Sequence, residues 1–115
     1  MSHLKLGTMM KALPLVDMAP NERRLIEFVL TNGVKRVWRN YQQQNLAGVV
    51  ALHLGITKSR ASVALISLRK KGWLAQGTDL NDHHELRIGD SFHDECNLAL
   101  ARRTVRAACG MDLWA

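Results

Sequence analysis

Apolar residues between Leu46 and Leu74 recur at the spacing of two short helices separated by a tight turn. The segment is LAGVVALHLGITKSRASVALISLRKKGWL. Its first half predicts a helix that ends at His53 or Leu54, where Gly55 supplies the left-handed backbone conformation that a tight turn requires. The inward stripe of this predicted helix consists of Ala47, Val50, Ala51 and Leu54.

The second half of this segment has a regular apolar face. Thr57 is the predicted N-cap, Ile56 is expected to insert into the core, and Gly72 follows the last turn. Between them, four residues fall at positions i, i+3, i+4 and i+7, which places them on one side of a helix: Ala61, Ala64, Leu65 and Leu68. Two short helices joined by a glycine-containing turn predict a helix-turn-helix.

Two further segments of helical character precede this motif. Around Met9–Met18 we expect a short helix or an extended arm, stopped by Ala19-Pro20. Asn21 then predicts an N-cap, and the apolar spacing that follows predicts a helix over Glu22–Thr31. Asn32-Gly33 is the expected stop signal of this helix.

The remaining segments predict a small sheet. Val34–Tyr41 is compatible with either a short helix or a strand. Trp73–Gln76 and Glu85–Ile88 predict two strands, and the polar sequence GTDLNDHH between them predicts the tip of a hairpin. We therefore expect a mainly helical α+β domain with a small β-hairpin, arranged as a winged helix-turn-helix with flanking N- and C-terminal helices.

A last helix is predicted from a cap at Asp90 or Ser91 to Ala108. It carries two apolar lines, which predicts a helix that is deeply packed or shared with a partner subunit. We expect residues 1–20 to form an arm or short helix, 21–90 the winged helix-turn-helix, and 91–115 a C-terminal helix. The first and last segments are the expected homodimer contacts, through Leu98, Ala101, Val105 and Trp114.

The charge pattern narrows the class of partner. The chain has 115 residues, a net charge of +6 and no Asp or Glu from Phe28 to Thr78. An acid-free window favours a polyanionic partner because phosphate is not repelled there. The cations of this window are Lys35, Arg36, Arg39, Lys58, Arg60, Arg69, Lys70 and Lys71, of which the last three are expected to complement the helix dipole.

The residues GITKSRASVALISLRKKGWL, followed by TDLNDHHELRIGDSF, resemble the turn, recognition helix and wing of the multiple antibiotic resistance regulator (MarR) family. The resemblance covers Leu46 to about Phe92. It implies a regulator that binds double-stranded DNA as a two-fold dimer on a palindromic site, of bacterial, phage or plasmid type. The implied DNA contacts are Thr57, Lys58, Ser59, Arg60, Ser62 and Val63 in the major groove, and Lys35, Arg36, Arg39, His83, His84 and Arg87 on the backbone.

The resemblance also implies a role for each part of this surface. Arg60 is expected to pair with a guanine edge, Lys58 with phosphate or guanine, and Val63 with a thymine methyl group; simple helix packing is the alternative for Val63. The wing carries His83 and His84 where the family usually has arginines. We therefore expect the wing to contribute little to DNA binding.

Other kinds of site have weaker support in the sequence. His83, His84, His93, Asp94 and Cys96 are a potential metal-binding group, but their spacing matches no common zinc pattern. Cys96 and Cys109 are interpreted as small apolar residues rather than oxidant sensors. We expect no metal, no cofactor and no enzyme activity, since no phosphate-binding glycine loop or nucleophile elbow is present.

Two functional hypotheses remain. The first is a cytoplasmic, sequence-specific DNA-binding regulator without membrane contact, favoured by the acid-free window. The second is a winged-helix adaptor that docks on another protein without binding DNA, favoured by the acidic residues between Asp79 and Glu95. Fold alone does not separate these hypotheses.

Overall fold

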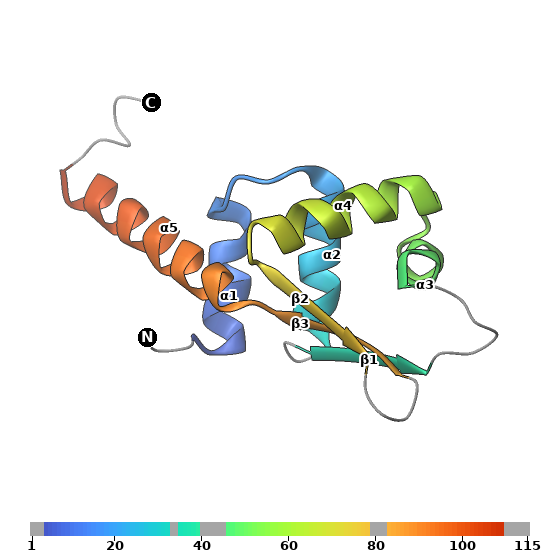
Figure 1. The fold of residues 1–115 in the computed structure, drawn as a ribbon. Helices are drawn as coiled ribbons and strands as arrows, with labels where there is room; N and C mark the ends of the chain where they lie inside the picture. Colours follow the sequence, from blue (N-terminus) through green and yellow to red (C-terminus); the bar gives the residue numbers. More distant parts are fainter. Residues whose placement is uncertain (1–3, 33–34, 40–45, 79–82, 110–115) are drawn as a thin grey trace.

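The computed structural model describes residues 4–32, 35–39, 46–78 and 83–109, and the side chains of these ranges except those of 35–39, 76–78, 83–84 and 106–109. Helices and strands follow one another in the order expected of a winged helix (Figure 1). The elements are α1 (Leu6–Ala12), the 3-10 helix η1 (Leu13–Leu15), α2 (Pro20–Thr31), β1 (Lys35–Arg39), α3 (Leu46–Leu54), α4 (Lys58–Lys70), β2 (Leu74–Thr78), β3 (His83–Ile88) and α5 (Asp90–Cys109).

The strands form one antiparallel sheet in the order β1-β3-β2. Lys35–Arg39 is thus a strand, which decides the choice left open by the sequence: it pairs along β3 from Lys35 opposite Arg87 to Arg39 opposite His83. The hairpin strands are longer than predicted. His83 and His84 were expected at the hairpin tip, but they belong to β3, because this strand has a pairing partner on each side.

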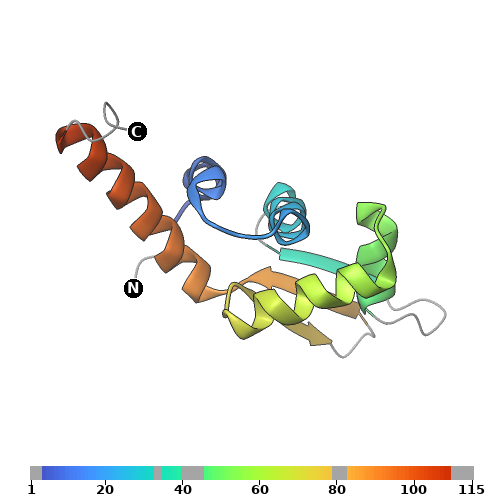
Figure 2. The ribbon, with the colours of Figure 1, turned by 90° about the horizontal axis from the view of Figure 1, so that it is seen from above.

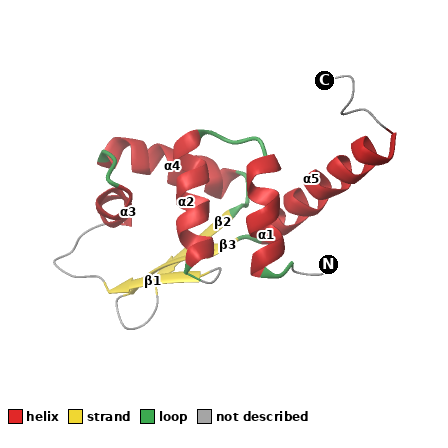
Figure 3. Ribbon diagram, turned by 180° about the vertical axis from the view of Figure 1, so that it is seen from behind, coloured by secondary structure: helices red, strands yellow, loops and turns green. Residues whose placement is uncertain are grey.

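The core lies between the sheet and the helices. Viewed from behind, α2 stands between α1 and α3, and α4 runs across behind α2 (Figure 3). Helix α2 contacts β1 and β3, and α4 contacts β2. The largest fully buried side chains come from five helices and one strand: Phe92, Met9, Leu25, Ile26, Leu30, Leu68, Leu86, Val29, Val50 and Cys96. This arrangement is a winged helix-turn-helix, as the sequence predicted.

Local backbone chemistry sets the boundaries of α3 and α4. Gly55 and Gly72 have φ values of +67° and +74°, which side-chain-bearing residues rarely adopt. After each glycine, the next amide donates back to a carbonyl of the preceding helix, Ile56 to Ala51 and Trp73 to Leu68. At the start of α4, the Thr57 hydroxyl accepts a hydrogen bond from the Arg60 amide at 3.2 Å. The predicted turn, cap and helix end are therefore confirmed.

The N-terminal segment differs from the prediction in its details. It is helical rather than extended, but the helix begins at Leu6 and continues through η1 to Leu15. Asn21 does not cap α2, because Pro20 is already helical and Ala19 occupies the cap position. Glu22 supplies the missing polar group, since its carboxylate accepts from the Ala19 amide at 3.0 Å.

Helix α5 begins at Asp90 itself, so Asp90 is a first-turn residue rather than the cap. Its first half packs against α1 and η1, where Phe92, Cys96 and Ala99 are buried. Its second half projects away from the other elements (Figures 1 and 2), and Leu98 and Val105 are 45% and 57% exposed. Leu98, Ala101 and Val105 on the second apolar line are therefore exposed within the part of the chain that the structure describes.

Candidate nucleic-acid interface

Helices α3 and α4 meet at an angle that suits a helix-turn-helix. They are bent by 111° at the Gly55 turn, within the range of about 90–120° that is typical of this motif. Among the described residues, no single helix is long and apolar enough to cross a membrane, and α3 with α4 reaches that length only across this bend.

Helix α4 has a buried inner face and an exposed outer face, and the six predicted leading-edge residues lie at its N-terminal end. Its inner face is the predicted stripe from Ala61 to Leu68, and these four residues are buried. Five of the six leading residues are exposed and Ser62 is half-buried. Val63 is 68% exposed, so none of the helices that the structure describes covers it. The six residues are Thr57, Lys58, Ser59, Arg60, Ser62 and Val63.

The basic end of α4 divides into two parts. Arg69 and Lys70 are exposed in the last turn. Lys71 is the C-cap residue, and its ammonium lies 4.6 Å from the centre of the Trp73 ring and 3.2 Å from a carboxylate oxygen of Glu22. Lys71 is thus tied to α2, whereas the preceding two cations extend the basic surface.

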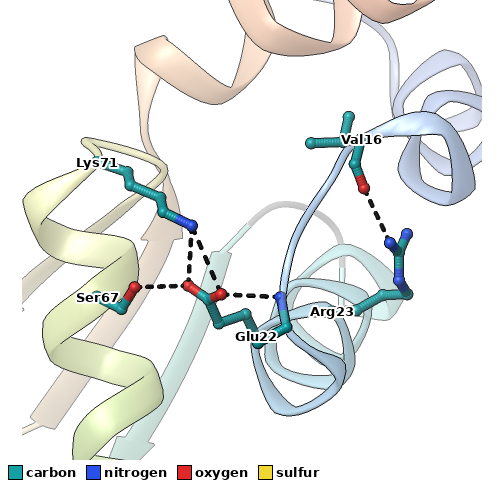
Figure 4. Close-up of polar contacts among 6 residues, drawn as sticks. Val16, Glu22, Arg23, Ser67 and Lys71 are labelled. Atoms are coloured by element: carbon teal, nitrogen blue, oxygen red, sulfur yellow. Dashed lines mark hydrogen bonds and ion pairs between the residues drawn. The ribbon is translucent and has the colours of Figure 1, made fainter.

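Glu22 is a buried carboxylate that joins α2 to α4 (Figure 4). It accepts a hydrogen bond from the Ser67 hydroxyl at 2.7 Å, in addition to the bonds from Ala19 and Lys71. Burial by itself raises the pKa of Glu22, but the bonds from Ser67, Ala19 and Lys71 outweigh this effect, so the pKa is lowered below its ordinary value of 4.5. The carboxylate is charged at neutral pH and holds the C-terminal end of α4 against α2.

Two arginines of α2 connect this helix to its other neighbours. Arg23 donates to the carbonyls of Leu13 and Val16, the latter at 2.8 Å (Figure 4). Arg24 donates to the carbonyl of Leu54 at the end of α3. The sequence contained no indication of tertiary contacts for Glu22 or for these arginines, because their partners lie in other elements.

A groove of about 450 Å³ runs beside α4 on the side that faces the start of α2. Its α2 wall is the Ala19–Glu22 segment, and its α4 wall includes Arg60, Val63 and Ser67. Arg60 therefore borders both this groove and the exposed face of the helix. The sequence contained no signal for this groove, which forms only where α2 and α4 come together.

The other predicted DNA contacts lie on β1 and β3. The backbones of Lys35, Arg36 and Arg39 are in β1, and those of His83 and His84 are in β3; the side chains of all five lie outside the described part of the structure. Arg87 is exposed, and its guanidinium lies 3.8 Å from the carboxylate of Glu85. This nearby acid reduces the positive potential that Arg87 presents.

His93 and Cys96 of α5 are buried in the core. His93 is buried, and its Nδ1 accepts a hydrogen bond from the Leu4 amide at 3.0 Å. Cys96 is fully buried, and burial together with the charge of Glu95 raises the pKa of its thiol to about 11, as expected of an apolar core cysteine. Within the described ranges, no group of three or more His, Cys, Asp or Glu residues is placed to hold a metal ion.

Comparison with known proteins finds similarity at the level of structure but not of sequence. No protein-family model matches the chain, and no curated protein matches it. Among solved structures, it is similar to a crystal structure of a MarR family transcription regulator, with 13% sequence identity and a TM-score of 0.48. The alignment covers 95% of this chain and 66% of the other. The winged helix-turn-helix assignment rests on the order and pairing of the elements described above.

Proposed function

We propose that this protein is a sequence-specific, double-stranded DNA-binding transcriptional regulator of MarR-like type that inserts α4 into the major groove. The observation that carries the proposal is the outer face of α4. It combines exposed Lys58 and Arg60 with small serines, and it contains no acidic residue. The major groove of DNA is lined by phosphates and attracts such a face, and small side chains permit close approach to base edges.

The residues of this surface have distinct roles in the proposal. Arg60 pairs with the O6 and N7 acceptors of a guanine, and Lys58 contacts phosphate or guanine. Lys35, Arg36 and Arg39 neutralise backbone phosphates beside the recognition helix. The wing contributes less, because Arg87 lies next to Glu85.

Fluorescence anisotropy on random and on selected duplexes, measured over a range of salt concentrations, tests this proposal. Lys58→Ala is expected to weaken binding to all sequences and to reduce the salt slope by about 1. Arg60→Ala is expected to cost about 1–3 kcal/mol and to relax the preference at one base pair. The matched controls are Lys11→Ala and Arg102→Ala, which remove exposed cations from α1 and α5.

The outcome at low salt is decisive. A protein that shows no binding to any duplex at low salt refutes the DNA-binding function and favours the adaptor hypothesis. Equal losses in the control variants refute the assignment of α4 as the reading element, because they indicate only a general effect of net charge.

We further propose that the active form is a homodimer joined through the N-terminal segment and α5. The exposed second apolar line of α5 supports this, since Leu98, Ala101 and Val105 lie along it; Trp114, the fourth predicted contact, is outside the described residues. Leu98→Glu with Val105→Glu should halve the mass measured by light scattering, whereas Leu52→Glu on α3 should not. A wild-type protein that is monomeric at concentrations where it binds DNA refutes the dimer.

A further inference from the structure

Two neighbouring aliphatic side chains lie in the middle of the outer face of α4. Val63 is 68% exposed and Ile66 is 47% exposed. Single exposed apolar residues are common on protein surfaces, but these two are three positions apart and therefore adjacent on the same side of the helix. They lie opposite the buried stripe from Ala61 to Leu68, so nothing in the described part of the chain covers either of them fully.

The surroundings of this pair identify the kind of surface that it matches. The nearest positions on the same face are Ser59 and Ser62, which are too short to shield the pair. Exposed cations stand at both ends of the helix: Lys58 and Arg60 before the pair, and Arg69 and Lys70 after it. A partner that suits this face is negatively charged at its edges and carries small apolar groups between them.

Duplex DNA has this combination in its major groove. Phosphates line both edges, and the 5-methyl group of thymine is the apolar group that base pairs present there. Duplex RNA lacks the methyl group, and its major groove is too narrow and deep for a helix. The chemistry of the face therefore selects thymine-containing DNA.

The spacing of the two side chains agrees with the spacing of base pairs. Three residues of an α-helix span about 4.5 Å along its axis, and successive base pairs are separated by about 3.4 Å. The two side chains thus reach neighbouring base pairs when the helix lies in the groove. Neither side chain carries a hydrogen-bond donor or acceptor, so methyl contact is the discrimination available to them.

We propose that Val63 and Ile66 are specificity-determining residues that recognise the 5-methyl groups of two thymines at neighbouring base pairs. This inference rests on the proposed DNA-binding function. It adds Ile66, which sequence reasoning did not include among the DNA contacts, because the four-residue inward stripe does not show how exposed the opposite face is.

Replacing thymine by deoxyuridine tests the inference directly, because it removes the methyl group and leaves base pairing intact. Duplexes that the full-length protein selects from a random pool provide the probe, and each thymine is replaced in turn. Burial of one methyl-sized group corresponds to about a fourfold change in affinity. We expect a loss of about this size at each of two neighbouring base pairs, and about 15-fold for both together.

Variants of the two residues complete the test. The Val63→Ser and Ile66→Ser variants should each lose the preference for thymine over uracil at one of the two base pairs and retain it at the other. Both sites are exposed, and serine has a helix propensity close to those of valine and isoleucine, so folding should be unaffected. Leu52→Ser is the matched control, since Leu52 is 77% exposed on α3, and it should keep both preferences.

The possible failures are distinguishable. Tight binding to selected duplexes with less than a twofold effect of uracil at every position overturns this inference but leaves the DNA-binding function standing. Retention of both preferences in the two serine variants also overturns it. A protein that selects no duplex and binds none at low salt refutes the proposed function itself, and this inference with it.

Discussion

Removal of the Glu22 carboxylate is expected to destabilise the fold and to loosen the attachment of α4 to α2. In Glu22→Ala, the Ser67 hydroxyl and the Ala19 amide lose an anionic acceptor, and Lys71 loses its ion-pair partner. A hydrogen bond to a charged group contributes about 1.5–3 kcal/mol. The Lys71 side chain is 38% exposed and is screened by solvent, so its share is small.

The net cost follows from what each former partner does after the change. Ser67 borders the groove and Ala19 is exposed, so water replaces part of each lost bond. We therefore expect Glu22→Ala to lower the free energy of unfolding by about 2–3 kcal/mol. For a chain of this size, that corresponds to a fall in Tm of about 8–12 °C. Glu22→Gln retains an acceptor oxygen and should cost about 1 kcal/mol.

The same carboxylate predicts a specific pH dependence. Because its folded-state pKa is lowered below 4.5, the unfolded chain binds this proton more tightly than the folded protein does. The stabilisation from Glu22 is therefore fully present above pH 4.5 and is lost as the pH falls through the folded-state pKa. Glu22→Gln should remove this part of the acid destabilisation.

Urea denaturation between pH 3 and pH 7 measures both effects. The matched control is Glu27→Gln, an exposed carboxylate on the same helix. A loss below about 0.5 kcal/mol for Glu22→Ala, or an equal change of pH dependence in Glu27→Gln, refutes the argument that buried hydrogen bonds to Glu22 hold α4.

Two further predictions concern backbone packing and thiol chemistry. Gly89→Ala should lower the free energy of unfolding far more than Gly55→Ala does, because a Cβ at Gly89 would lie 2.0 Å from the carbonyl oxygen of Gly72. At Gly55 only the positive φ opposes a side chain, at a cost of about 1–2 kcal/mol. Similar costs for the two variants in urea denaturation would contradict this prediction. In a Cys109→Ser background, Cys96 should react with a disulfide reagent at pH 8 only as fast as the protein unfolds, because the thiol is fully buried and the reagent cannot reach it in the folded state. Its pKa of about 11 further lowers the fraction of reactive thiolate. Immediate reaction in the folded state would show that the thiol is accessible.

The helix-turn-helix was predictable because its signals are local. The backbone bonds that end α3 and α4 join residues five positions apart, and the Thr57 cap acts on an amide three positions away. A short window of sequence contains all the groups involved. The apolar spacing of α4 similarly defines its buried face without reference to the rest of the chain.

The strand β1 and the length of the hairpin were not predictable in this way. Lys35–Arg39 is a strand because it pairs with β3, about 50 positions later in the chain. His83 and His84 extend β3 for the same reason. Pairing between distant segments depends on where the helices place them, so local sequence left a helix and a strand equally compatible for β1.

The sequence by itself determined the helix-turn-helix, its basic edge and the acid-free window, since composition and short-range hydrogen bonding are properties of neighbouring residues. Only the tertiary structure decided that Glu22 is a buried anchor for α4, that Val63 and Ile66 form an exposed pair, and that half of α5 is uncovered. These features arise where segments far apart in the chain meet or fail to meet. Burial depends on the whole packing arrangement, and no single stretch of sequence contains it.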